Sequence, residues 1–226
     1  MTDLSLNREI ANELKRFCEL VFLDHHISSV RHQEGLEGCI VDTSKCGTML
    51  VYEHISSLGY DEEDDEYLAH IVDDHDLWRN RMPESDRLSA LLGMLERDNF
   101  IDELLDADVD LVLGKHSKEI DIKIQSRNNY VAGVKCYEPD TKDGLRRCVV
   151  FAERYTSYVG DRFLSEGYDV VYIVNFFSCT VSLRSRVVDV SKIAERNGGG
   201  GHPRAAGYTL AQETEMSFCE MILNHR

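Results

Sequence analysis

The sequence has no long hydrophobic run. Its apolar residues come in short groups, far below the roughly 20 consecutive apolar residues that a membrane-spanning helix needs. The first segment, MTDLSLNREI, is too polar for a secretory signal peptide. We therefore expect a soluble, cytoplasmic protein with no membrane partner.

Paired cysteines are also lacking. The seven cysteines are scattered singly, without the C-x-x-C pairs of a zinc site or the framework of a small secreted domain. We expect reduced and mostly packed thiols.

Basic charge is scarce, with 25 Lys and Arg against 41 Asp and Glu and a net charge of −16. Tight sequence-independent binding to long duplexes is disfavoured, because that affinity comes mainly from neutralising many phosphates. A short nucleic-acid substrate stays compatible with this charge. The surplus of carboxylates is equally compatible with a well-solvated surface that has no bearing on function.

The spacing of apolar residues predicts helices and strands in alternation along the first half of the chain. The predicted strand covers residues 20–23, and the predicted helices cover residues 9–18, 47–58, 62–78 and 87–105.

A charged segment over residues 109–130 has apolar residues at helical spacing and predicts a linker helix, which would separate a first domain (1–108) from a second (131–226). The second domain is predicted to contain strands over 131–137, 148–152, 169–177 and 180–184 and helices over 154–166 and 190–197. The predicted fold is α/β in two domains, with a parallel sheet in the first and a smaller α/β arrangement in the second.

Three side chains of metal-ligand type, Asp24, His25 and His26, follow the strand predicted over residues 20–23. They would lie at the carboxyl end of the strand, where open α/β sheets place their ligand sites. Adjacent side chains on a strand point to opposite faces, so all three bind one ion only if the backbone turns. Taken alone, the triplet is more typical of a capped strand end than of a metal site.

A second group of ligand-type residues lies near the end of the helix predicted over 62–78, in the segment VDDHDLW. Carboxylates together with imidazole suit Mn²⁺ or a similar ion. The alternative is a charged helix end beside a buried Trp78. The group consists of Asp73, Asp74, His75 and Asp76.

A run of four glycines, Gly198 to Gly201, precedes His202 and Arg204. Glycines let the backbone approach a ligand closely and present N–H groups to an anion, so the run is interpreted as a phosphate loop, with a flexible linker as the alternative. Upstream, Arg184 ends a predicted strand, and its planar guanidinium can bind a phosphate through two hydrogen bonds. A surface salt bridge is the alternative for Arg184.

Together and in this order, the segments LDHH, VDDHDLW, SLRS and GGGGHPRAAG resemble the DHH phosphoesterase superfamily. The last segment is similar to the signature of the DHH-associated C-terminal domain. The segment DHDLW and the short chain resemble the nanoRNase branch, which holds NrnB-like oligoribonucleases and cyclic-nucleotide phosphodiesterases. The resemblance covers nearly the whole chain and implies two Mn²⁺ ions in the first domain and substrate binding by the second.

The resemblance also implies roles for single residues of the first domain. Asp3, in the segment TDLS, would bridge the two metals, and His25 would bind one of them. His26 would face the scissile phosphate as a catalytic residue, and Asp24 would orient the histidines. Asp74 would be a further metal ligand, and the choice between it and Asp76 is open.

In the second domain, the resemblance implies contacts between the protein and the terminal phosphate of the substrate. The implied substrate-binding residues are Arg184, Gly200, Gly201 and His202.

The family's first motif, a strand leading into His-x-x-x-Asp-x-Asp, is not found before Asp3. We expect a DHH domain that is incomplete at its N-terminus. The expected function is Mn²⁺-dependent, two-metal hydrolysis of short oligonucleotides or of linear or cyclic dinucleotides; a homodimer is compatible with it. The alternatives are a catalytically impaired nucleotide-binding fragment and a hydrolase of pyrophosphate or 3′-phosphoadenosine phosphate.

Overall fold

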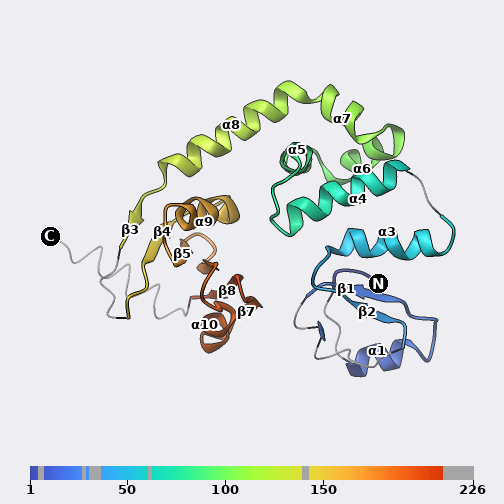
Figure 1. Ribbon diagram of the computed structural model, residues 1–226, viewed down its shortest axis with the longest axis horizontal. Helices are drawn as coiled ribbons and strands as arrows, with labels where there is room; N and C mark the ends of the chain where they lie inside the picture. The colour runs from blue at the N-terminus through green and yellow to red at the C-terminus, as the bar shows by residue number, and fades with distance from the viewer. Residues whose placement is uncertain (5–7, 27–28, 31–36, 61–62, 139–142, 211–226) are drawn as a thin grey trace. The chain divides into compact units, whose positions relative to one another are not determined.

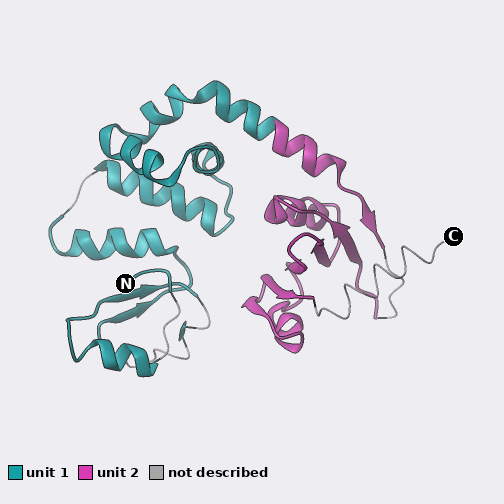
Figure 2. Ribbon diagram, turned by 180° about the vertical axis from the view of Figure 1, so that it is seen from behind, with its two compact units in different colours: residues 1–125 teal, residues 126–226 magenta. Residues whose placement is uncertain are grey.

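The computed structural model describes residues 1–4, 8–26, 29–30, 37–60, 63–138 and 143–210 (Figure 1). The chain divides into two compact units, Met1–Gln125 and Ser126–Arg226, and the division falls within helix α8 (Ser117–Gly133) (Figure 2). The linker expected over residues 109–130 spans this division, and the domain boundaries stay predictions. Of the helices described, none is both long and apolar enough to cross a membrane.

Unit 1 begins with a small parallel sheet. Strand β1 (Phe22–Asp24) pairs in parallel with β2 (Cys39–Val41), and Thr2 forms a parallel bridge to Leu23 at the other edge of β1. All of β1 is buried, as is typical of the inner strand of a parallel sheet. The strand predicted over 20–23 is therefore present, shifted toward Asp24.

The helices of unit 1 agree only in part with the predicted ones. The predictions over 47–58 and 62–78 are confirmed. The single helix predicted over 87–105 is wrong, because the chain leaves its helix at Gly93 and begins another after Glu96. The helix predicted in the linker is likewise interrupted at His116. The bounds are α1 (Arg8–Leu14), α3 (Gly47–Ser57), α4 (Glu63–Asp76), α5 (Pro83–Leu92), α6 (Arg97–Asp106), α7 (Val109–Lys115) and the first part of α8.

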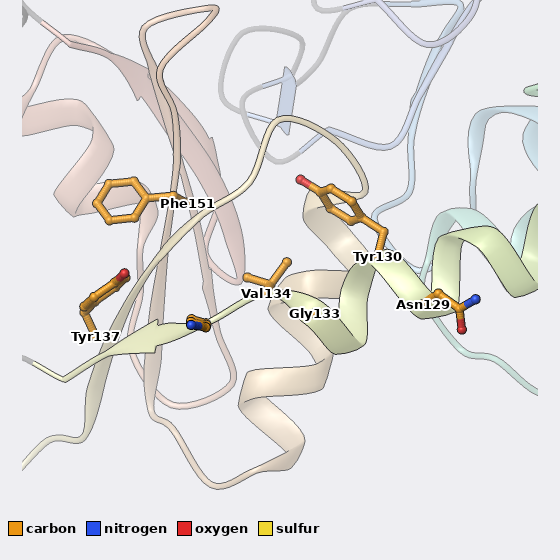
Figure 3. Close-up of a pocket in the computed structure, with 7 residues that line it drawn as sticks. Asn129, Tyr130, Gly133, Val134, Tyr137 and Phe151 are labelled. Atoms are coloured by element: carbon orange, nitrogen blue, oxygen red, sulfur yellow. The ribbon is translucent and has the colours of Figure 1, made fainter.

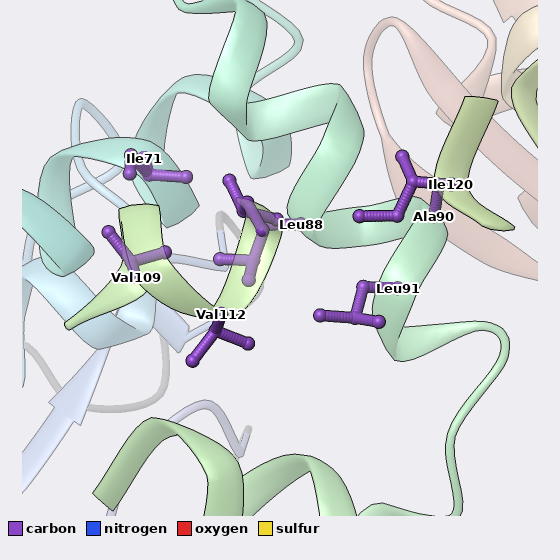
Figure 4. Packing of buried hydrophobic residues seen from close by; sticks show 8 residues of the cluster. Ile71, Leu88, Ala90, Leu91, Val109, Val112 and Ile120 are labelled. Atoms are coloured by element: carbon purple, nitrogen blue, oxygen red, sulfur yellow. The ribbon is translucent and has the colours of Figure 1, made fainter. Parts of the chain in front are cut away.

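These interruptions allow several short helices to share one hydrophobic core (Figure 4). Leu88 and Leu91, one helical turn apart on α5, are buried together with side chains of the neighbouring helices. A continuous helix over 87–105 would carry the following apolar residues away from this core. The core includes Ile71 of α4, Val109 and Val112 of α7 and Ile120 of α8.

Unit 2 is built on a six-stranded sheet with strand order β3-β4-β5-β6-β8-β7. Strands β4 and β5 are parallel and are connected through helix α9 (Thr156–Ser165), and the other neighbours are antiparallel. The strand bounds are β3 (Cys136–Tyr137), β4 (Arg147–Phe151), β5 (Val170–Asn175), β6 (Thr180–Ser185), β7 (Gly200–His202) and β8 (Ala205–Thr209).

Each face of this sheet has its own apolar cluster. Val150 and Ile173 face α9, while Leu183 and Val170 lie in the cluster with α10 (Ser191–Arg196). This follows from the alternation of side chains along a strand. The strand predicted over 131–137 is mostly wrong: its first residues continue α8, and only Cys136–Tyr137 pair with β4. The predicted α/β fold, with a parallel sheet first and a smaller α/β domain second, is confirmed.

Candidate metal site and substrate-binding residues

The ends of two parallel segments bring Asp3 next to the triplet Asp24-His25-His26. The backbone N–H of Asp3 donates to the carbonyl of Leu23 at 3.0 Å, and that of Leu23 donates to the carbonyl of Met1 at 2.9 Å. Residues 1–3 therefore run beside β1 in the same direction, and both segments end at the same edge of the sheet. This is the edge where parallel sheets place their ligand sites.

Asp3, His25 and His26 offer ligand atoms that all lie within 4.8 Å of one another. Nε2 of His25 lies 3.0 Å from Oδ1 of Asp3, and Nδ1 of His26 lies 3.9 Å from the same oxygen. His25 is nearly buried, whereas Asp3 is exposed, so a ligand can reach the group from solvent. Two imidazoles and a carboxylate are a donor set that fits Mn²⁺.

Asp24 lies beneath this group and is fully buried. Its carboxylate accepts hydrogen bonds from the backbone N–H of His25 at 2.8 Å and from Nδ1 of His26 at 2.7 Å. It also accepts one from the hydroxyl of Ser29. Burial raises the pKa of Asp24, but these hydrogen bonds outweigh it and the net pKa is lowered. An ionised Asp24 therefore holds both histidines in place.

The backbone turns just after β1, as the triplet requires. The N–H groups of both His25 and His26 point to the Asp24 carboxylate, and the imidazole rings meet edge to face at 4.6 Å. The turn caps the end of the strand and also brings both histidines toward Asp3, and their role as metal ligands stays a prediction. Asp24 caps the turn while its two neighbours point toward Asp3.

Gly47, the first residue of α3, makes room for Asp3. A Cβ on Gly47 would lie only 3.1 Å from Cβ of Asp3. Asp3 itself has a left-handed backbone with φ of 58°, which aspartate tolerates better than most residues. Its carboxylate thus lies close to the start of α3, where the helix dipole favours negative charge.

The carboxylate side chains at the end of α4 point in different directions. Oδ2 of Asp76 lies 3.6 Å from Nδ1 of His25. The carboxylate of Asp73 binds the backbone N–H of Cys46 at 2.7 Å and Arg79 at 3.0 Å. Of these carboxylates, the one beside the Asp3–His25 pair is Asp76.

Asp74 points away from the histidines and is buried. It accepts hydrogen bonds from the backbone of Arg81 and Met82 and from the hydroxyl of Ser85, all at 2.7 to 3.1 Å. Burial raises the pKa of Asp74, but these hydrogen bonds lower it overall. Its ligand role stays a prediction that this geometry does not favour, and Asp76 is the better placed of the two.

In unit 2, Arg184 is half-buried on β6 and packs against α9. Its stem lies against Gly160, where an added Cβ would come within 2.5 Å of Cγ of Arg184. Its guanidinium donates to the hydroxyl of Ser157 at 3.2 Å and to the carbonyl of Leu183 at 3.0 Å. Burial lowers the pKa of Arg184. Within the described part of the chain it has no ion pair with a carboxylate, which argues against the surface salt bridge.

The glycine run is partly a strand. Gly200 to His202 form β7, paired with β8 at the end of the sheet order. Gly201 has φ of 138°, and an added Cβ would lie 2.6 Å from Cα of Ala206, so packing requires glycine there. At Gly200 an added Cβ would meet nothing within 4 Å. The interpretation as a loop is therefore wrong for residues 200–202, although a phosphate contact by their backbone stays a prediction.

Strand register brings Arg184 and His202 to one face of this sheet. Arg184 is paired with Ala205 of β8, and Ala205 is paired with His202 of β7. Directly paired residues point to the same face, so the two side chains share a row two strands apart, roughly 10 Å. This spacing is compatible with contacts to one phosphorylated ligand.

Comparisons with known proteins agree with these motifs. The family model of the DHHA1 domain matches residues 158–224. The oligoribonuclease NrnB of Bacillus subtilis (strain 168) is 27% identical over 242 residues, an alignment that covers 96% of this chain and 60% of that protein. Residues 158–224 are thus similar to a DHHA1 domain, and nearly the whole chain is similar to this oligoribonuclease. It spans 60% of the length of this curated relative.

The fold also agrees with a solved structure. The crystal structure of RecJ in complex with Mn²⁺ from Thermus thermophilus aligns with 98% of this chain and 43% of that chain, at 15% identity and a TM-score of 0.60. At this identity the likeness shows a shared fold and nothing further.

Two residues that position this site were not found from the sequence. Ser29, which donates to Asp24, lies five residues after it, and no pattern marks it. Gly47 stands at the start of a predicted helix, where its contact with Asp3 depends on how α3 packs. Both roles arise from tertiary contacts within unit 1.

Asp74 and Asp76 of α4 are expected to respond differently to substitution. Asp74→Ala should lower the free energy of unfolding by about 1–3 kcal/mol, because buried N–H and O–H donors lose a charged acceptor. Asp76→Ala, at an exposed side chain, should leave stability within about 0.5 kcal/mol and weaken Mn²⁺ binding. Chemical denaturation and calorimetric titration measure the two effects. The reverse pattern would assign the ligand role to Asp74.

Proposed function

We propose that this chain is a metal-dependent phosphodiesterase that hydrolyses short oligoribonucleotides, including dinucleotides. The observation that carries the proposal is the convergence of Asp3, His25 and His26 within 4.8 Å at the carboxyl edge of the parallel sheet. The similarity to a protein named oligoribonuclease supports the substrate class. A net charge of −16 favours short substrates over long duplexes.

Asp3 and His25 would hold Mn²⁺, with Asp76 close to His25. When bound, metal ions of this kind polarise phosphate oxygens and generate a hydroxide nucleophile near neutral pH. The geometry described here provides one such ligand group, and the two-metal arrangement remains part of the proposal. The mixed imidazole and carboxylate donors favour Mn²⁺ over Mg²⁺, which prefers oxygen ligands.

His26 has the arrangement of a catalytic residue. Because Nδ1–H donates to Asp24 at 2.7 Å, the neutral ring carries its lone pair on Nε2. With Nδ1 held by Asp24, Nε2 is the ring nitrogen that would face a phosphate oxygen of the substrate. Asp24 itself would be a positioning residue, since its oxygens are bound by His25, His26 and Ser29.

Unit 2 would bind the substrate's terminal phosphate. Arg184 supplies a guanidinium with no carboxylate partner among the described residues, and His202 lies in the same row of the sheet. The backbone of Gly200 and Gly201 at the edge strand would add N–H donors. These few contacts suit a small anionic ligand. A long nucleic acid would instead need a long basic track on the protein surface.

The test is Mn²⁺ titration by calorimetry, paired with hydrolysis assays on this chain. The substrates are a 5′-phosphorylated dinucleotide, a cyclic dinucleotide, 3′-phosphoadenosine phosphate and pyrophosphate. We expect Mn²⁺ binding and the fastest turnover on the linear dinucleotide. Binding of a nucleotide without any turnover would make the chain a binding module. Faster turnover of 3′-phosphoadenosine phosphate or pyrophosphate would overturn the proposed substrate class.

A further inference from the structure

Unit 2 exposes a cluster of aromatic rings away from its apolar clusters. Tyr137, Phe151 and Phe176, here called the aromatic patch, are 56%, 42% and 40% exposed. The rings of Phe151 and Phe176 are stacked at 5.1 Å, and those of Tyr137 and Phe151 meet edge to face at 5.6 Å. Tyr137 and Phe151 lie close together on the neighbouring strands β3 and β4 (Figure 3). These three rings are therefore exposed to solvent in the folded chain.

A pocket of about 420 Å³ adjoins the aromatic patch. The end of α8 and the following segment form its other side, and Tyr130 of α8 stands across from the rings of the patch (Figure 3). Its lining combines aromatic rings with polar side chains, and such convergent groups can orient a bound ligand. The residues that line it are Asn129, Tyr130, Gly133, Val134, Lys135, Tyr137 and Phe151.

Two positively charged side chains lie in or beside this pocket. Lys135 lines it and is exposed, and the guanidinium carbon of Arg154 lies 4.7 Å from the ring centre of Tyr130. Neither Lys135 nor Arg154 forms an ion pair within the described residues. Glu138, the acid that follows Tyr137, is bound by the hydroxyl of Tyr168 and lies 3.8 Å from Arg146. Lys135 and Arg154 thus place two positive charges at the pocket, with Glu138 and Glu153 nearby, in a chain of net charge −16.

Exposed aromatic rings beside cations without a carboxylate partner are the features by which proteins bind single-stranded nucleic acids. Bases stack on the rings, and the cations contact the phosphates. A duplex hides its base faces and would not use the rings in this way. A surface that joins two copies of the chain would instead be depleted in lysine at its centre.

We infer that the aromatic patch, with Lys135 and Arg154, is a base-stacking site for a single-stranded oligoribonucleotide. This inference rests on the proposed function for the choice of RNA as ligand. It adds a site that recognises bases and does not use the Asp3, His25 and His26 group. Substrates longer than a dinucleotide would gain affinity from it, because each stacked base adds binding energy.

The test is fluorescence anisotropy with a labelled oligoadenylate of about eight nucleotides, within the site sizes of single-strand binding domains. Excess EDTA in place of metal prevents hydrolysis of the probe. The double variant Tyr137→Ala, Phe151→Ala should bind at least about tenfold more weakly than the unsubstituted chain. Tyr137→Phe and Phe151→Trp, which keep the rings, should retain affinity. Lys135→Ala should flatten the dependence of affinity on salt.

A matched control is Tyr60→Ala, which removes a 72% exposed aromatic residue from unit 1. It should leave oligoadenylate affinity unchanged. Equal affinity of the double variant and the unsubstituted chain would overturn the inference, even if the chain hydrolyses dinucleotides. Patch-dependent binding by a chain without hydrolytic activity would uphold the site and refute the proposed function. A dimer that the double variant converts to a monomer, with RNA affinity unchanged, would overturn the site in favour of contact between copies.

Discussion

His25→Ala is expected to abolish the metal-dependent hydrolysis of a phosphorylated dinucleotide. His25 is the residue that joins the carboxylates of the site, with one ring nitrogen 3.0 Å from Asp3 and the other 3.6 Å from Asp76. Loss of an outer-shell partner of a metal ligand typically costs 10- to 100-fold in affinity or activity, so removal of a ligand should cost more than about 100-fold. Initial rates at saturating Mn²⁺, together with calorimetric titration, measure both effects.

The matched control for this substitution is His70→Ala. His70 lies on α4 with an exposed side chain, and its neighbour is Glu66 at 3.7 Å, away from the ligand group. Thermal unfolding of both variants separates loss of the site from loss of the fold. Full activity of His25→Ala at ordinary Mn²⁺ concentrations would refute the assignment of this site.

Arg184→Ala is expected to raise the Michaelis constant for a phosphorylated dinucleotide by roughly 10- to 100-fold, with little change in kcat. A hydrogen bond to a charged group contributes about 1.5–3 kcal/mol, which corresponds to this range. An interaction made equally in the ground state and the transition state affects KM alone. Steady-state kinetics on phosphorylated and unphosphorylated dinucleotides should show that the effect requires the terminal phosphate.

Arg186→Ala provides the matched control for this change. Arg186 is an exposed arginine two residues further on, and its guanidinium pairs with Asp161 at 2.7 Å. Arg184→Lys should recover only part of the affinity, because an ammonium lacks the planar fork of the guanidinium. A fall in kcat with KM unchanged would contradict a role of Arg184 in substrate binding.

The fold class was predicted correctly from the sequence, but the bounds of several helices and strands were not. Helices such as α3 and α4 were located because their apolar spacing and ends are local features. The break between α5 and α6 was missed because Gly93 alone is a weak signal, and the core that the separate helices share is non-local. The short β3 was predicted too long because the apolar residues before it belong to the last turn of α8.

The candidate site was predicted in its residue types and only partly in its arrangement. The grouping of His25 and His26 with Asp3 could be expected only through the resemblance of the motifs, since Asp3 lies more than one element away. The glycine run was taken for a loop, yet its last glycines pair with β8. Strand pairing depends on a partner elsewhere in the chain, which glycine spacing alone does not reveal.

By itself, the sequence determined the α/β class, the order of the family motifs and the residue types able to bind a metal and a phosphate. The tertiary structure decided which carboxylate of α4 lies beside His25. Asp74 and Asp76 are two residues apart on a helix with 3.6 residues per turn, so their side chains point about 200° apart. Only the packing of α4 against α3 and α5 sets which of these directions faces the histidines. That packing turns Asp74 toward the start of α5 and Asp76 toward His25.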